Sequence, residues 1–185
     1  MTFSKETKHE SHDSKSAGNE FQNFALAASL LKNVAELGYT QATEVQAQVI
    51  PAALAGGDLL VSSQTGSGKT AAFLLPLIHQ LIEANPNNSP VPGRAQPKVL
   101  VLCPTRELCI QISKDLLKFA KHLDYVKIVP VYGGTSIENQ IKSIKKGVQI
   151  IVGTPGRTKD LIRRKVLKLD VVNKVVLDEA DEMLS

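Results

Sequence analysis

The chain has 185 residues, 43% of them hydrophobic, and a formal net charge of +4 at pH 7. This is about the length of one domain, and the apolar content is sufficient for a sizeable core. The small positive charge permits a polyanionic partner but does not require one. Cys103 and Cys109 are too few for a disulfide framework, and no histidine pair beside them completes a metal site, so we interpret both as structural thiols.

No stretch reaches the roughly 18 uninterrupted apolar residues of a membrane span, and the N-terminus lacks the apolar segment of a signal peptide. The sequence therefore predicts a cytosolic protein without a membrane partner. Residues 1–20 are charged and rich in serine. We expect them to form a disordered polar tail, because they cannot bury enough surface to offset the entropy of ordering.

From Phe21 onward, the chain alternates between two patterns. Two helical segments come first, at 26–37 and 43–55, and short β-branched runs then predict strands at 58–63, 98–103, 126–132, 148–153 and 173–178. Helical spacing between the strands covers 69–84, 105–121, 136–146 and 156–165, and the proline-rich stretch 84–97 predicts a loop. This alternation predicts a mostly parallel sheet, and the near-continuous Val, Ile and Leu runs are typical of strands covered on both faces.

The stretch SSQTGSGKT at 62–70 nearly matches the phosphate-loop pattern G-x-x-x-x-G-K-[ST]. Gly68, Lys69 and Thr70 are in place, but Ser63 stands at the first glycine position. The loop follows a predicted strand and opens a predicted helix, whose N-terminal N–H groups attract phosphate. Lys69 would neutralise phosphate charge and Thr70 would hold Mg²⁺. Taken alone, this loop leaves a glycine-rich turn without a ligand as an alternative.

An acidic pair, Asp178 and Glu179, follows the last predicted strand. A carboxylate at the tip of a buried strand is suited to hold Mg²⁺ near a phosphate loop, and a second acid can deprotonate the attacking water. The two features together favour a nucleotide-hydrolysing site with Mg²⁺ over a turn without a ligand, and the resemblance described next implies that the nucleotide is ATP.

Asp178 to Asp181 spell DEAD, and SQTGSGKT closely resembles the first motif of DEAD-box RNA helicases, where the position of Ser63 is normally alanine. The resemblance runs from Phe21 to the end of the chain. It implies an α/β fold of the RecA-like phosphate-loop type at 21–185, a three-layer sandwich, followed in the parent protein by a second RecA-like domain. Because the chain ends soon after its last predicted strand, we expect the sheet to be incomplete on one side.

The resemblance also implies roles for single residues. Asp178 would bind the metal with Thr70, Glu179 would activate water, and Asp181 would couple the site to the second domain. The residues that it places around the phosphates are Ser63, Gln64, Thr65, Gly66, Ser67, Gly68, Lys69 and Thr70.

GYTQATEVQ at 38–46 looks like the family's Q motif, with Phe21 seventeen residues before Gly38. By this resemblance Gln46 would hydrogen-bond the adenine edge and Phe21 would stack on the ring. A carboxamide offers both the donor and the acceptor that adenine needs. Gln41 and Ala42 depart from the family pattern. Thr43 is expected to cap the second helix.

Three further motifs match the family: PTRELCIQ at 104–111, GG at 133–134 and TPGR at 154–157. Each follows a predicted strand, so all should emerge at the edge of the sheet that carries the phosphate loop. Glycine N–H groups, helix N-termini and arginines suit the sugar-phosphate backbone of RNA, without base specificity. The residues expected to bind RNA are Pro104, Thr105, Arg106, Gly133, Gly134, Thr154, Pro155, Gly156 and Arg157.

Three hypotheses follow. The first is the ATP- and RNA-binding domain of an ATP-dependent RNA helicase, in which RNA rather than DNA is implied by the resemblance alone. The second is a generic phosphate-loop NTPase or DNA translocase, which adenine specificity would argue against. The third is an ATP- and RNA-binding fragment without turnover, because the second domain would supply the transition-state arginines.

Overall fold

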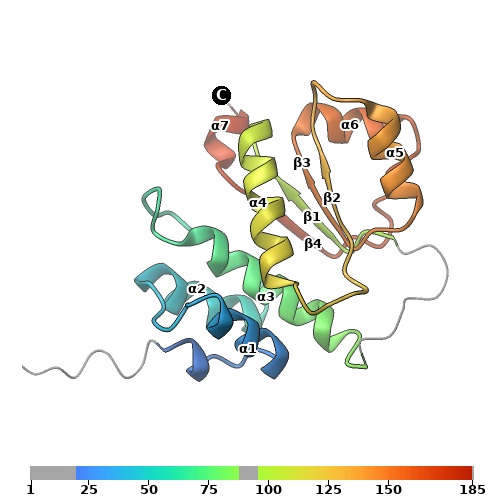
Figure 1. Ribbon diagram of the computed structural model, residues 1–185. Coiled ribbons are helices and arrows are strands. Elements are labelled where there is room, and N and C mark those ends of the chain that lie inside the picture. The colour runs from blue at the N-terminus through green and yellow to red at the C-terminus, as the bar shows by residue number, and fades with distance from the viewer. Residues whose placement is uncertain (1–19, 88–95, 185) are drawn as a thin grey trace, which may run out of the picture.

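The structure, a computed structural model, describes residues 20–87 and 96–184 (Figure 1). The expected tail lies outside these ranges except for Glu20, and so does most of the predicted loop at 84–97. In chain order the elements are η1 (Phe21–Asn23), α1 (Ala28–Glu36), α2 (Glu44–Ala55), α3 (Lys69–Glu83), β1 (Val99–Leu102), α4 (Arg106–Phe119), β2 (Ile128–Val131), α5 (Ile137–Lys145), β3 (Ile150–Gly153), α6 (Pro155–Arg163), β4 (Lys174–Leu177) and α7 (Ala180–Leu184). All the predicted helices are present.

The four strands form one sheet in the order β2-β3-β1-β4, and every pair is parallel. Leu102 at the end of β1 lies opposite Gly153 of β3 and Leu177 of β4. The predicted parallel sheet is therefore confirmed. The carboxyl ends of three adjacent strands lie level with one another, so the loops that follow them start side by side.

The predicted strand at 58–63 is wrong. Within the described residues this segment has no regular secondary structure and pairs with no strand. Leu59 and Leu60 are 47% and 102% exposed, and on the edge strand β4 Val175 and Leu177 are also largely exposed. An apolar composition favours a strand only where a neighbour satisfies the backbone N–H and C=O groups. The phosphate loop thus follows an unpaired segment.

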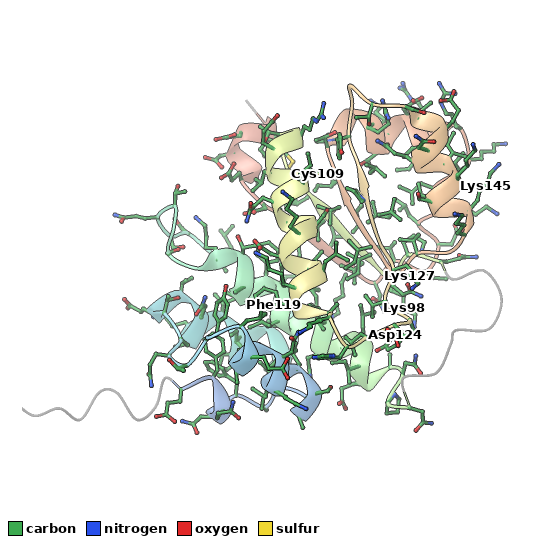
Figure 2. The ribbon with its side chains drawn as sticks, in the orientation of Figure 1. Lys98, Cys109, Phe119, Asp124, Lys127 and Lys145 are labelled. Carbon is green, nitrogen blue, oxygen red and sulfur yellow. The ribbon has the colours of Figure 1, made fainter. Side chains whose placement is uncertain are left out.

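Helices cover both faces of the sheet and give the three expected layers (Figure 1). Because side chains alternate along a strand, Val99 and Val101 of β1 enter a core shared with α1, α3 and α4. Leu100, between them, enters a second core shared with α5 and α6. Cys109 and Phe119 mark the two ends of α4 along the first of these cores (Figure 2).

Three helices begin with a hydroxyl cap close to the predicted motifs. Thr43 caps α2 and forms a capping box with Gln46, which confirms its predicted role. Thr105 accepts a hydrogen bond from the N–H of Leu108 at 3.2 Å and caps α4, and Ser136 caps α5. These caps satisfy orphan N–H groups at the first turn of each helix. Among the described residues, no helix combines the length and apolarity that crossing a membrane requires.

The close approach of β3 to α6 yields a stability prediction. A Cβ added to Gly153 would meet the Thr158 hydroxyl and lie 2.7 Å from Val131 Cγ2. Both neighbours are buried, so they cannot yield freely. We expect Gly153→Ala to lower the free energy of unfolding by about 1–3 kcal/mol, measured by urea denaturation. Gly156→Ala is the matched control, because nothing lies within 4 Å of its added Cβ. Equal losses in the two variants would contradict this packing argument.

Candidate functional site

The phosphate loop is a tight turn that leads into α3. Gly66 and Gly68 have φ angles of 79° and 90°, in the left-handed region that favours glycine. Ser63 is not among the described residues with positive φ. The two later glycines therefore carry the unusual backbone geometry, and a side chain at position 63 is compatible with the loop. Gly68 is the N-cap of α3, so the free N–H groups of this helix begin at the loop.

The loop is closed by its own contacts. The Lys69 ammonium donates a hydrogen bond to the Ser63 carbonyl, and the hydroxyls of Ser63 and Ser67 are hydrogen-bonded at 2.8 Å. The Lys69 ammonium has three N–H donors, so a phosphate group that enters the loop can bind it beside the Ser63 carbonyl or in its place. Gln64 and Thr65 at the tip are exposed, and Thr70 lies half-buried in the first turn of α3.

Gln46 connects the Q motif to the phosphate loop. Its side chain is buried, its Oε1 accepts from the N–H of Thr43 at 3.0 Å, and its Nε2 donates to the Gly68 carbonyl at 3.1 Å. A Cβ on Gly68 would lie 2.5 Å from this nitrogen, so the two segments are in close contact. The structure thus brings residues 43–46 and 66–69 together, as the motif assignments require.

A hollow of about 290 Å³ lies beside Gln46, and the aromatic ring that lines it is Tyr39. Phe21 does not line it: its side chain is fully buried and meets the Tyr39 ring edge-on, with centroids 5.8 Å apart. In this arrangement Phe21 offers no free face to an adenine, and the stacking role expected of it stays a prediction. The large apolar ring is buried against Tyr39 and Phe24 instead.

The acidic pair lies at the end of β4, where the N–H of Asp178 continues the pairing with β1 by donating to the Leu102 carbonyl at 2.9 Å. Burial raises the pKa of Asp178, while a hydrogen bond from the Glu179 N–H and the charge of Lys69 act in the opposite direction. Burial, and then the charge of Glu182, raise the pKa of Glu179. Lys69 thus lies within electrostatic reach of both acids.

Glu179 has a φ of 51°, which is unusual for a residue with a side chain. Left-handed backbone costs roughly 1–2 kcal/mol at a non-glycine residue. Here it turns the chain from β4 into α7. Asp181 is exposed on α7. Its coupling role stays a prediction.

The donors present fit a Mg²⁺ ion with few protein ligands. The Thr70 hydroxyl follows Lys69 directly in the chain, and the Asp178 carboxylate lies within the field of the Lys69 charge. Oxygen atoms are the ligands that Mg²⁺ prefers. Among the described residues, no cluster of three or more His, Cys, Asp or Glu side chains could hold a metal. Mg²⁺ commonly takes one or two protein ligands and completes its shell with phosphate and water.

The motif loops after β1, β2 and β3 meet at one edge of the sheet. The guanidinium of Arg106 lies 5.1 Å from the centre of the Tyr132 ring. A Cβ added to Gly134 would lie 3.4 Å from Arg106 Nη1, so the glycine pair is close to this side chain as well. Arg157 donates to the Thr135 carbonyl and to Gln140 Oε1. Around these arginines, the remaining predicted residues are exposed or half-buried: Pro104, Thr105, Gly133, Gly134, Thr154, Pro155 and Gly156.

Sequence reasoning missed two residues of this edge. Tyr132 precedes the glycine pair and supports Arg106, and Gln140 follows it by six residues and contacts Arg157. A lone glutamine in an amphipathic helix carries no signal of such a contact. Cys103 and Cys109 are fully buried free thiols, as predicted, and a hydrogen bond with Cys109, together with burial, raises the pKa of Cys103.

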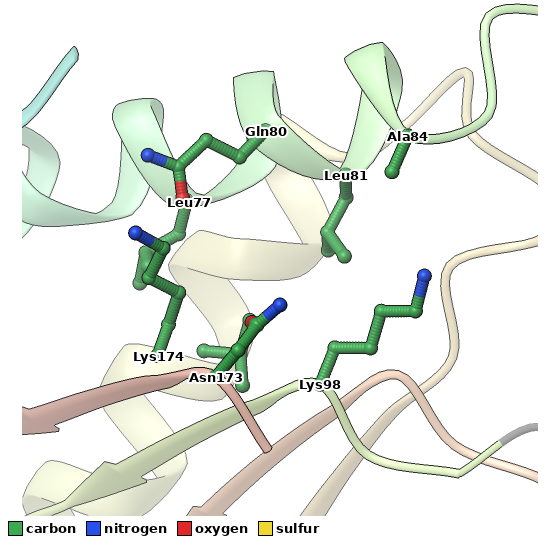
Figure 3. A pocket seen from close by; sticks show the side chains of 8 residues that line it. Leu77, Gln80, Leu81, Ala84, Lys98, Asn173 and Lys174 are labelled. Atoms are coloured by element: carbon green, nitrogen blue, oxygen red, sulfur yellow. The ribbon is translucent and has the colours of Figure 1, made fainter. Parts of the chain in front are cut away.

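A second hollow, of about 250 Å³, lies at the opposite end of the sheet between α3 and the starts of β1 and β4 (Figure 3). Lys98, Lys174 and the Gln80 carboxamide stand around its apolar floor. None of the motif residues lines it, so it is separate from the candidate site.

The raised pKa of Asp178 predicts a pH-dependent stability. The folded protein holds this proton to a higher pH than the unfolded chain, so ionisation destabilises the fold above the folded pKa and has no effect below the usual value of about 3.8. We expect Asp178→Asn to raise the melting temperature at pH 7, with a gain that shrinks as pH falls towards that value. Asp181→Asn, at an exposed acid, is the control. A gain that is the same at every pH would contradict the role of burial.

The comparisons with known proteins agree with this geometry. The family model described as DEAD/DEAH box helicase matches residues 43–185. The chain is 47% identical over 166 residues to the "ATP-dependent RNA helicase CshA" of Listeria monocytogenes, which covers 90% of this chain and 30% of that protein. It is 44% identical over 165 residues to the "DEAD-box ATP-dependent RNA helicase CshA" of Bacillus subtilis, covering 89% of this chain and 31% of that protein.

The chain thus spans about 30% of the length of the curated relatives that it matches. The match includes the phosphate loop, the DEAD sequence and all three loops at the carboxyl edge of the sheet. With its all-parallel α/β sheet and these motifs, the chain belongs to the DEAD/DEAH box helicase family.

Proposed function

We propose that this chain is the ATP- and RNA-binding first RecA-like domain, over residues 21–185, of an ATP-dependent RNA helicase that acts in the cytoplasm. One observation carries the proposal: Lys69 of the phosphate loop lies within electrostatic reach of Asp178 and Glu179, although more than 100 residues separate them in the chain. The relatives named above are RNA helicases, which supports the same activity for the parent protein.

In this proposal the phosphate loop binds the nucleotide through its backbone N–H groups. The Lys69 ammonium leaves the Ser63 carbonyl and neutralises phosphate oxygens, and the α3 N-terminus adds its partial positive charge. When bound, Mg²⁺ would be held by Thr70 and Asp178 and would draw negative charge from the phosphates. Glu179 would orient the attacking water and accept its proton. Its raised pKa increases its proton affinity, as a general base requires.

Adenine would occupy the hollow beside Gln46. Tyr39, which is 38% exposed, offers the ring at its wall, and Phe21 supports Tyr39 from beneath. One N–H of the Gln46 carboxamide and a second lone pair of its Oε1 stay available for the base edge, after the contacts with Gly68 and Thr43. This arrangement favours adenine over guanine.

RNA would lie across the loops after β1, β2 and β3. Arg106 and Arg157 reach phosphate oxygens, and the exposed glycine pair and the N-terminus of α6 offer N–H groups. Binding of this kind depends strongly on salt and little on base sequence. The cationic residues beyond α6, among them Arg164 and Lys165, would extend the positive surface.

Hydrolysis would require the second RecA-like domain, with Asp181 facing it. An arginine supplied from another domain is worth roughly 10³–10⁵ in the rate of related phosphoryl transfers. The 185-residue chain by itself should therefore bind ATP and RNA with negligible RNA-stimulated turnover.

The nucleotide proposal can be tested by thermal melting of this chain with Mg²⁺ and either ADP or GDP. A ligand at 100 times its dissociation constant adds about 2.7 kcal/mol to the free energy of unfolding. We expect a clear rise in melting temperature with ADP and little with GDP. Equal shifts would favour a generic NTPase without an adenine pocket. The absence of a shift with either nucleotide would remove the proposed nucleotide site.

The catalytic role of Glu179 is tested in a chain that carries both domains. Glu179→Gln should preserve ATP affinity and abolish hydrolysis, because the amide cannot accept the proton of the water. The RNA-bound state should then persist, as seen by slow release of labelled RNA. Glu83→Gln, at an exposed acid at the end of α3, is the control and should keep its turnover. Hydrolysis at the wild-type rate in Glu179→Gln would assign the base elsewhere.

A further inference from the structure

A buried glutamine joins the loops after β2 and β3. Gln140, on α5, is 8% exposed. Its Nε2 donates to the Tyr132 carbonyl and to the Thr135 hydroxyl, both at 3.0 Å, and its Oε1 accepts from Arg157 Nη1 at 3.1 Å. Both N–H groups and the carbonyl of this carboxamide are therefore engaged, which is what a buried polar side chain requires.

The same contacts orient the guanidinium of Arg157. Nη1 and Nη2 both donate to the Thr135 carbonyl at 3.3 Å, in addition to the bond from Nη1 to Gln140. A guanidinium has five N–H donors, so three are used and two are left: the Nε–H and the second Nη2–H. Within residues 20–87 and 96–184 these two have no protein partner. They lie on one edge of the group, at the spacing of two phosphate oxygens.

We propose that Gln140 is a positioning residue for RNA binding at the edge of the sheet formed by the loops after β1, β2 and β3. Together with the Thr135 carbonyl, it holds Arg157 by three donors so that the Nε–Nη2 edge stays open for bidentate contact with an RNA phosphate. Through Tyr132, it also fixes the start of the glycine loop and the ring beneath Arg106. The inference rests on the proposed RNA-binding function and assigns a role that the matched motifs do not include.

The chemistry of the site requires a carboxamide. The Tyr132 carbonyl can only accept a hydrogen bond and the Arg157 guanidinium can only donate, so the side chain between them must supply both. A glutamate would repel the Tyr132 carbonyl and neutralise Arg157 by pairing with it. A leucine of similar volume would leave both neighbours without their partner. An arginine side chain that is already fixed by hydrogen bonds loses less conformational entropy when phosphate binds than a mobile arginine side chain does.

The test measures binding of a short labelled oligouridine by the 185-residue chain, with Mg²⁺ and a non-hydrolysable ATP analogue, over a range of salt concentrations. We expect Gln140→Leu to weaken binding roughly 5-fold, which corresponds to the net contribution of one ordinary hydrogen bond. Gln140→Glu should lower the slope of log K against log salt by about one, as Arg157→Ala does, because both remove one cationic contact. In an Arg157→Ala background, Gln140→Leu should cause little further loss.

Asn139→Ala is the matched control, because it removes an exposed carboxamide from the adjacent position of α5 and should leave RNA binding unchanged. The Arg157 Nε–H resonance gives a readout without RNA: it should indicate a rigid side chain in the wild type and a mobile one in Gln140→Leu. A rigid Arg157 in that variant, or additive losses in the double variant, would overturn the positioning role while RNA binding stands. A wild-type chain that binds no RNA would overturn the RNA role itself.

Discussion

The backbone of β1 is hydrogen-bonded to β3 along one edge and to β4 along the other, with Leu102 opposite both Gly153 and Leu177. Because all three strands are parallel and in register, the chain leaves them at the same edge of the sheet. This pairing places the loop at 103–106 between the loop at 154–157 and the acidic pair at 178–179. The loop at 154–157 and the acidic pair are therefore close to each other at one edge of the sheet, on either side of the loop at 103–106.

Buried carboxamides hold the helices and loops at this scaffold. Gln46 joins α2 to the phosphate loop, and Gln140 joins α5 to the loops after β2 and β3. Away from the site, Asn33 of α1 donates to the last carbonyls of α4, those of Lys118 and Phe119, at 2.8 and 2.6 Å. A hydrogen bond adds only about 1 kcal/mol net, but an unpaired buried partner costs about 1–3 kcal/mol. Such residues define position more than they add stability.

The phosphate loop is formed without a ligand, and its polar groups are hydrogen-bonded to one another. The Lys69 ammonium donates to the carbonyl of Ser63, and the Ser63 and Ser67 hydroxyls bond to each other. Nucleotide binding would thus exchange internal hydrogen bonds for bonds to phosphate, and affinity reflects the difference between the two sets. Burial raises the pKa of Asp178 and also affects cation binding. A partly desolvated carboxylate is stabilised more by a nearby cation than an exposed carboxylate is.

The sequence by itself determined the features that depend on nearby residues. The left-handed turns at Gly66 and Gly68, the cap at Thr43 and the order of strands and helices follow from local backbone preference and spacing. Only the tertiary structure decided what depends on distant neighbours. The apolar segment 58–63 has no strand beside it, Phe21 is covered by Phe24 and Tyr39, and Gln140 meets Arg157 from another helix. Whether an apolar segment finds a neighbouring strand, whether a ring is covered and which partners a carboxamide meets are set by residues far apart in the chain, so no local pattern encodes them.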